Sequence, residues 1–155
     1  MTIHNQLPRL EDILPHRGNM LLIDRLIDFN NESMVAEYLP KSDAWYSDSE
    51  GKMPAWIGIE LMAQAVAAHV GVLKHRDGAS QKNGVLLGSR RYCSTTPSFS
   101  TEAPLKIQVT SIFRDISGLG AYDCNISCGI ATLATAILKV FEPEDFKTFV
   151  QGSIS

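Results

Sequence analysis

The chain has 155 residues, of which 45% are hydrophobic and 20% are charged, and this composition is typical of one soluble globular domain. Its net charge of −3 and its sequence pI of about 5.8 provide no basic surface for nucleic acid or for an anionic membrane. Residues 1–6 lack the charged segment and apolar run of a secretory signal, so we expect a cytoplasmic protein with neither of these partners.

Two strands joined by a turn are the first elements that the sequence predicts. The run Met20–Phe29 is mostly apolar and ends in four turn-forming residues, 30–33. Met34–Leu39 then has the pattern of a hairpin partner. A polar loop with scattered aromatic side chains, Pro40–Met53, follows the hairpin and leads to the most apolar part of the chain.

The segment Pro54–Leu73 predicts one long helix that is hydrophobic on nearly every face. Proline suits the first helical position, and the basic residues 74–76 suit the last turn. The helix is long enough to cross a bilayer, but Glu60, Gln64, His69 and its many small residues favour burial in a protein core. His69 lies on the helix face opposite Glu60 and is expected to be a core or interface residue.

Glu60 is the one carboxylate of this apolar segment. Burying a lone carboxylate is costly, so such a group usually finds a partner or takes up a proton. Its place near the start of the helix, beside backbone N–H groups without helical partners, predicts an acid/base site for acyl chemistry. Gln64 lies one turn further along the same face, so a hydrogen-bonded core network of the two side chains is the alternative.

The second half of the chain is rich in predicted strands. Their patterns cover residues 84–93, 105–113, 121–127 and 130–141. Residues 117–120 mark a turn, and Gly129 marks a bulge or tight bend. Strands that flank one apolar helix predict an α+β domain in which an antiparallel sheet wraps around that helix. We expect this single domain to cover residues 1–141 and a polar C-terminal tail to follow at 142–155.

The three cysteines, Cys93, Cys124 and Cys128, are odd in number and have no metal-ligand spacing. Cys124 and Cys128 fall in one predicted strand, on one face and too far apart for a disulfide. We therefore expect reduced thiols and no metal site.

Three short motifs recur in an order and at a spacing similar to those of a known family. They are Leu14-Pro15-His16-Arg17, then Leu21-Leu22-Ile23-Asp24-Arg25, and then Met53-Pro54 followed by Ile59-Glu60-Leu61-Met62-Ala63-Gln64. Over residues 9–141 the chain resembles the hotdog-fold 3-hydroxyacyl-[acyl carrier protein] dehydratases. The segments Met53–Trp56 and Leu86–Tyr92 look most like the predicted dehydratases of aryl polyene and related polyketide-like biosynthesis.

The resemblance implies a hotdog fold, a homodimer with acyl tunnels at its interface, and a substrate carried on the phosphopantetheine of an acyl carrier protein, with no other cofactor. Glu60 matches the helix acid of the family. The backbone N–H groups of Ala55 and Trp56 match the place where the family polarises the thioester carbonyl, and Gln64 and Arg90 are further candidates for substrate binding. Arg90 would meet the phosphopantetheine phosphate or an acidic carrier protein; a solvated strand arginine is the alternative.

The family's catalytic histidine has no counterpart in the loop 41–53, where Tyr46 stands at its position. Four explanations remain open. Asp43 or Asp48 acts as the base, Tyr46 acts as an acid or hydrogen-bond donor, Glu60 acts alone, or the domain binds acyl chains without converting them. A tyrosine base is disfavoured because the ordinary pKa of this side chain is about 10. For Asp43 the alternative is a solvated loop carboxylate, which is the more common role of such a residue.

These observations give three functional hypotheses. The first is a dehydratase that converts carrier-bound 3-hydroxyacyl thioesters into trans-2-enoyl thioesters. The second is a hotdog thioesterase, in which a helix carboxylate activates water or attacks the thioester directly. The third, favoured by the missing histidine, is a non-catalytic subunit for acyl binding or dimerisation.

Overall fold

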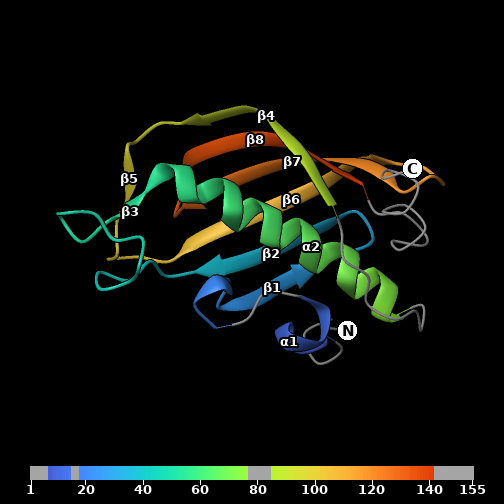
Figure 1. Ribbon diagram of the computed structural model, residues 1–155, viewed down its shortest axis with the longest axis horizontal. Helices are drawn as coiled ribbons and strands as arrows, with labels where there is room; N and C mark the ends of the chain where they lie inside the picture. Colours follow the sequence, from blue (N-terminus) through green and yellow to red (C-terminus); the bar gives the residue numbers. More distant parts are fainter. Residues whose placement is uncertain (1–6, 15–17, 77–84, 142–155) are drawn as a thin grey trace, which may run out of the picture.

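The computed structural model describes residues 7–14, 18–76 and 85–141 (Figure 1). Its helical elements are α1 (Leu10–Ile13), η2 (Gly18–Met20), η3 (Ala55–Ile57) and α2 (Gly58–Arg76). Its strands are β1 (Arg25–Phe29), β2 (Ser33–Tyr38), β3 (Met53–Pro54), β4 (Val85–Ser94), β5 (Ser98–Phe99), β6 (Leu105–Arg114), β7 (Leu119–Cys128) and β8 (Ala131–Phe141). The predicted tail, 142–155, and the motif residue His16 lie outside the described residues.

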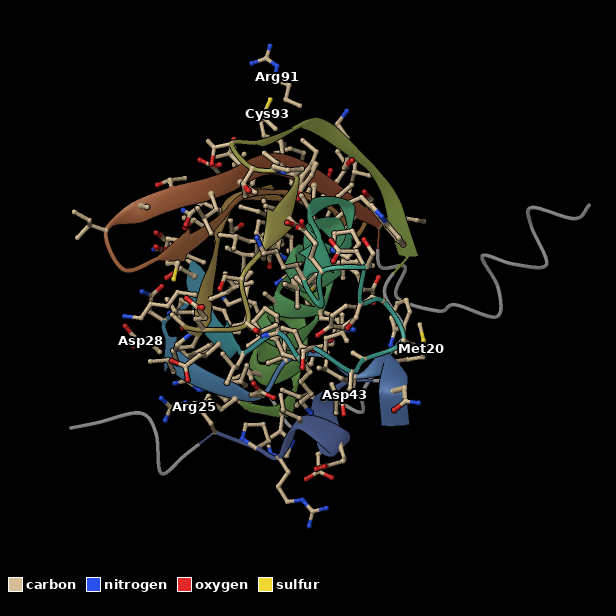
Figure 2. All side chains as sticks on the ribbon, turned by 90° about the vertical axis from the view of Figure 1, so that its left-hand side faces the viewer. Met20, Arg25, Asp28, Asp43, Arg91 and Cys93 are labelled. Atoms are coloured by element: carbon tan, nitrogen blue, oxygen red, sulfur yellow. The ribbon has the colours of Figure 1, made fainter. Side chains whose placement is uncertain are left out.

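A six-stranded antiparallel sheet in the order β1-β2-β6-β7-β8-β4 forms the main layer. The helix α2 lies along one face of this sheet (Figure 1), and in the end-on view the strands curve around it (Figure 2). The short strands β3 and β5 pair with each other near the start of α2. The predicted α+β arrangement, an antiparallel sheet wrapped around one buried helix, is confirmed.

Alternation of apolar and polar residues decides which face of a strand meets the helix. In β6, Leu105, Ile107 and Val109 are buried, whereas the intervening Lys106 and Gln108 are exposed. This period of two is the pattern expected of a strand with one face in the core and one in solvent. The buried set packs towards α2 and supplies the sheet side of the core.

The helix α2 is buried along most of its length because small and apolar residues fill nearly every position. By length and composition it could cross a membrane, yet 61% of its most apolar window is buried inside the protein. Gly71 allows α1 to pack closely against it, since a Cβ atom at Gly71 would lie 2.8 Å from the carbonyl oxygen of Ile13. The helix ends with the basic residues 74–76, whose positive charges interact favourably with the negative end of the helix dipole.

His69 is a core residue with a defined hydrogen-bond pattern. Its Nδ1 lies 2.7 Å from the hydroxyl of Tyr122, and its Nε2 lies 3.0 Å from the carbonyl oxygen of Asn30. Because that carbonyl can only accept, Nε2 carries the proton and Nδ1 accepts from Tyr122. The pKa of His69 is lowered, mainly because the imidazole is buried. The sequence-based expectation of a core histidine is confirmed.

The three cysteines are free thiols, as the sequence predicts. Cys124 is buried in β7, and burial raises its pKa to about 12. Cys93 is exposed on β4, and Cys128 is half-buried at the end of β7.

The predicted strand Met20–Phe29 is wrong in its first half. β1 begins only at Arg25, and residues 18–20 form a short 3₁₀ turn instead. A side chain causes the difference, because Oε1 of Gln64 accepts hydrogen bonds from the backbone N–H groups of Leu22 at 3.0 Å and Ile23 at 3.3 Å. Those amides are therefore not available to a neighbouring strand.

The predicted helix Pro54–Leu73 also begins differently. Pro54 is the residue before a 3₁₀ turn, Ala55–Ile57, and the α-helix proper runs from Gly58 to Arg76. Glu60 consequently lies in the first α-helical turn rather than the second. This shift brings the carboxylate closer to the positive end of the helix dipole.

The strands β1 and β4 form the two edges of the main sheet. β4 pairs with β8 through two register shifts, and it contains Gly88 at φ +156° and Arg91 at φ +57°. A non-glycine residue at positive φ is uncommon and marks a bulge here. The alternation of side chains between two faces, which a regular strand would show, is therefore interrupted at Arg91.

Candidate functional site

Glu60 lies where the 3₁₀ turn of residues 55–57 passes into α2. Its side chain is partly buried, and Oε1 accepts a 2.9 Å hydrogen bond from Nε2 of Gln64, one turn later. The pairing that the i, i+4 spacing predicts is thus confirmed as a contact. The positive end of the helix dipole lies beside this carboxylate and stabilises negative charge there.

Gln64 is completely buried and uses all four hydrogen-bonding positions of its amide. Oε1 accepts from Leu22 and Ile23, and Nε2 donates to the carbonyl oxygen of Met20 at 2.6 Å as well as to Glu60. The core network that the sequence offered as an alternative is therefore present. Within this chain every hydrogen-bonding atom of the amide is engaged, and one of these contacts holds Glu60. The substrate contact expected of Gln64 stays a prediction.

The backbone N–H of Ala55, which the sequence predicts as an oxyanion donor, already has a hydrogen-bond partner within the chain. It donates to the carbonyl oxygen of Pro97 at 2.9 Å and so extends the pairing of β3 with β5 by one residue. The carbonyl oxygen of Ala55 is also occupied, since it accepts from the hydroxyl of Tyr92. Both polar groups of this backbone are thus engaged within the chain, and the oxyanion role of Ala55 stays a prediction.

Substrate binding by Trp56 stays a prediction, with which the surroundings of its backbone N–H are compatible. Across the described parts of the chain, its N–H has no hydrogen-bond partner outside its own helix. N–H groups in the first turn of a helix lack intrahelical partners and suit a carbonyl oxygen or an anion. The indole side chain is 65% exposed and provides an apolar surface four residues before Glu60.

The loop before the helix separates the two candidate aspartates. Oδ1 of Asp48 accepts from the backbone N–H groups of Glu50 at 2.9 Å and Lys52 at 3.0 Å. This carboxylate therefore closes a turn, which disfavours a catalytic role. Asp43 is exposed and lines a cavity in the protein surface.

Tyr46 is only 5% exposed, and its hydroxyl group forms a hydrogen bond with the hydroxyl of Tyr38. The same oxygen of Tyr46 accepts from the backbone N–H of Lys41 at 2.9 Å. Burial and then the bond with Tyr46 raise the pKa of Tyr38 well above its ordinary value. Tyr38 is thus protonated near neutral pH, and the two side chains form a buried phenol pair in which either hydroxyl can donate.

A cavity of about 280 Å³ lies between the segment 18–24 and the loop 38–46. Both tyrosines of the phenol pair line it, and so does Asp43. The structure therefore brings together two of the three predicted catalytic residues, Tyr46 and Asp43. Tyr38 was missed by the sequence analysis, although the period of two in β2 places it on the buried face with its polar tip at the strand end.

Glu60, the third predicted catalytic residue, is not among the residues that line this cavity. Hydrogen bonds connect the two regions: Gln64 holds Glu60 and Met20, and Nε1 of Trp45 donates to the carbonyl oxygen of Asn19 at 3.0 Å. The segment 18–24 is therefore fixed on one side by the helix and on the other by the loop.

The predicted phosphate-binding arginine cannot be placed, because the side chain of Arg90 lies outside the described residues. Its neighbour Arg91 is exposed and lies with Cys93 at the end of the view opposite Met20 and Asp43 (Figure 2). Arg91 is thus remote from the cavity. Among the described residues, no three His, Cys, Asp or Glu side chains gather closely enough to hold a metal ion.

Comparison with known proteins identifies a family. A family model described as ApeP dehydratase, ApeP-like, matches residues 8–151. The structure is similar to that of the dehydratase heterocomplex ApeI:P from Xenorhabdus doucetiae, with a TM-score of 0.84 and 25% sequence identity. That match covers 92% of this chain and 95% of the other. Among curated proteins, no sequence matches the chain.

More distant structures share the fold alone. A hypothetical thioesterase with coenzyme A from Streptococcus pneumoniae has a TM-score of 0.62 at 13% identity, covering 76% of this chain and 86% of that one. The PaaI protein of the phenylacetic acid degradation operon of E. coli has a TM-score of 0.59 at 14% identity. That match covers 75% of this chain and 80% of PaaI. The common architecture is the sheet wrapped around one long helix.

Proposed function

This chain belongs to the ApeP-like dehydratase family of hotdog proteins in aryl polyene biosynthesis, and we propose that it dehydrates carrier-bound 3-hydroxyacyl thioesters to trans-2-enoyl thioesters in the cytoplasm. In this reaction a base removes a proton from C2, the C3–O bond breaks, and the hydroxyl leaves as water after gaining a proton. The thioester bond stays intact throughout.

The position of Glu60 is the observation that carries the proposal. It is the one carboxylate of the buried helix, and Gln64 holds it at the helix start. A carboxyl group fixed in this way can exchange a proton with the substrate without first reorganising its surroundings. The N–H of Trp56, on the preceding turn, is a predicted donor to the thioester carbonyl.

We propose that a second hotdog chain completes the site. Glu60 is not among the residues that line the cavity with Tyr46 and Asp43, and the loop 41–53 has no histidine. The relative from Xenorhabdus doucetiae is one of two chains in a dehydratase heterocomplex, which supports a partner for this chain too. The homodimer expected from the sequence is the other candidate assembly, and an acyl carrier protein would deliver the substrate to either.

A second candidate function follows from the missing histidine. In that case this chain binds the acyl group or holds a catalytic partner in place without converting substrate itself. The test is to incubate the chain with a 3-hydroxyacyl carrier protein and to weigh the carrier by mass spectrometry. Loss of one water with the thioester intact supports the dehydratase, a carrier stripped of its acyl group indicates a thioesterase, and an unchanged mass from an intact, folded chain indicates the binding role.

The same assay defines the assembly. Dehydration by the purified chain alone supports a homomeric site. Dehydration only after addition of a second hotdog dehydratase chain supports a heteromeric one. The Glu60→Gln variant is the control for both arrangements, because glutamine preserves size and hydrogen bonding but cannot exchange the proton.

A further inference from the structure

The cavity between residues 18–24 and 38–46 contains a hydrogen-bond donor that the described protein groups do not satisfy. Tyr38 and Tyr46 are 3% and 5% exposed, and both line the cavity. Buried phenol groups nearly always have hydrogen-bond partners, since an unsatisfied buried donor destabilises the fold.

The two hydroxyl groups carry two protons, and one of these lies in the hydrogen bond between them. The other polar contact of the pair is the N–H of Lys41, which donates to Tyr46 at 2.9 Å and so accepts no proton. Whichever tyrosine donates to the other, one phenolic proton has no acceptor among the described residues. Because both side chains line the cavity, an acceptor that enters it can take this proton.

The remaining lining restricts the chemistry of that acceptor. Two acidic residues, Asp24 and Asp43, and one basic residue, Lys41, are among those that line the cavity. An excess of acidic groups disfavours an anionic ligand. A hydroxyl group suits both partners, because its oxygen accepts from the phenol and its proton can be donated to a carboxylate. A carbonyl oxygen satisfies only the first of these contacts.

We propose that the Tyr38–Tyr46 pair binds the 3-hydroxyl group of the acyl substrate in this cavity. The identity of the ligand rests on the proposed function; the requirement for a hydroxyl rests on the cavity itself. About 280 Å³ is at the lower end of the volumes of small-molecule sites, so the cavity accommodates the polar end of a substrate rather than a long acyl chain. The pair acts by hydrogen bonding and transfers no proton.

The experiment compares two ligands that differ only in the hydroxyl group. A 3-hydroxyacyl pantetheine thioester and the acyl thioester of the same chain length are titrated into the full chain by calorimetry. Glu60→Gln serves as the background for all proteins so that no turnover occurs. The hydroxylated ligand is expected to bind about five- to tenfold more tightly, the range typical of one neutral hydrogen bond.

Variants of the pair give a non-additive pattern that a merely structural role would not produce. Tyr38→Phe and Tyr46→Phe each leave one phenolic proton for the ligand, so each keeps a preference for the hydroxylated thioester. The double variant has no phenolic proton and is expected to bind both ligands equally. The matched control is Tyr122→Phe, which removes a buried, hydrogen-bonded hydroxyl beside His69 and should preserve the full preference.

The outcomes separate this proposal from the proposed function. Equal binding of the two ligands by the chain with both tyrosines, or no binding of either, would overturn the cavity assignment. A preference that survives in the double variant would overturn it too. If the chain dehydrates a carrier-bound substrate but binds the two thioesters equally, the dehydratase function stands and the cavity assignment fails. If the chain prefers the hydroxylated thioester but dehydrates no substrate, the dehydratase function is refuted and the cavity assignment is supported.

Discussion

At the scale of single residues, the amide of Gln64 contacts four protein atoms, three of them in the backbone of residues 20–23. We expect Gln64→Leu to lower the free energy of unfolding by about 3 kcal/mol, because buried backbone groups lose their partners. Turnover should also fall, through kcat rather than KM, since Glu60 loses its support. Urea unfolding and steady-state kinetics measure the two effects. A variant with unchanged stability and kcat would show that Gln64 has no positioning role.

The buried imidazole of His69 makes stability depend on pH. Burial lowers its pKa in the folded protein, whereas the unfolded chain titrates near the ordinary value of about 6.5. Below that value the unfolded chain binds more protons, so the free energy of unfolding is expected to decrease as the pH falls from about 7 towards 5. Urea unfolding across this range measures the slope, with His69→Gln as the control. Equal slopes in the two proteins would contradict the prediction.

The residue-level predictions succeeded where the interaction is local in sequence. Glu60 and Gln64 are four positions apart on one helix, and their pairing follows from helix geometry. The occupied N–H of Ala55 could not be foreseen, because its partner Pro97 is brought in by pairing of β3 with β5. The Tyr38–Tyr46 pair likewise depends on how the loop folds back on β2.

At the scale of elements, β4 and the start of α2 are in close contact at Gly58. A Cβ atom there would collide with the hydroxyl of Tyr92 and would lie 3.0 Å from Cδ1 of Ile126. We expect Gly58→Ala to destabilise the protein by about 1–3 kcal/mol, the usual cost of overpacking. Tyr92→Phe should cost less in that background than in the wild type, because it removes the colliding atom. A double-mutant cycle by urea unfolding measures the coupling, and simple additivity would contradict the contact.

The regular strands could be predicted because their alternation reflects one buried and one exposed face. β6, β7 and β8 follow the predicted patterns to within a few residues. The strand predicted from Met20 failed because a glutamine side chain, not a neighbouring strand, satisfies the amides of residues 22 and 23. A pattern of apolar residues cannot distinguish these two kinds of partner.

At the scale of the whole molecule, the predicted homodimer can be tested by mixing inactive subunits. Glu60→Gln protomers are combined with protomers that carry an inactivating change in the loop 43–48. In a homodimer with shared sites, half of the dimers are mixed and each has one intact site of two, so about a quarter of the wild-type rate should return. Subunit exchange is verified by native mass spectrometry. Exchange without recovery would show that each site is built within one chain or with a different partner.

The dehydration rate of Glu60→Gln, relative to the wild type, tests the central claim most directly. Both proteins are assayed, in the assembly that is active, by following the loss of water from a 3-hydroxyacyl carrier protein by mass spectrometry. We expect the rate to fall at least about a hundredfold, the low end for removal of an acid/base group, with the fold and substrate affinity preserved. Turnover close to that of the wild type would contradict the assignment of Glu60 as the acid/base group.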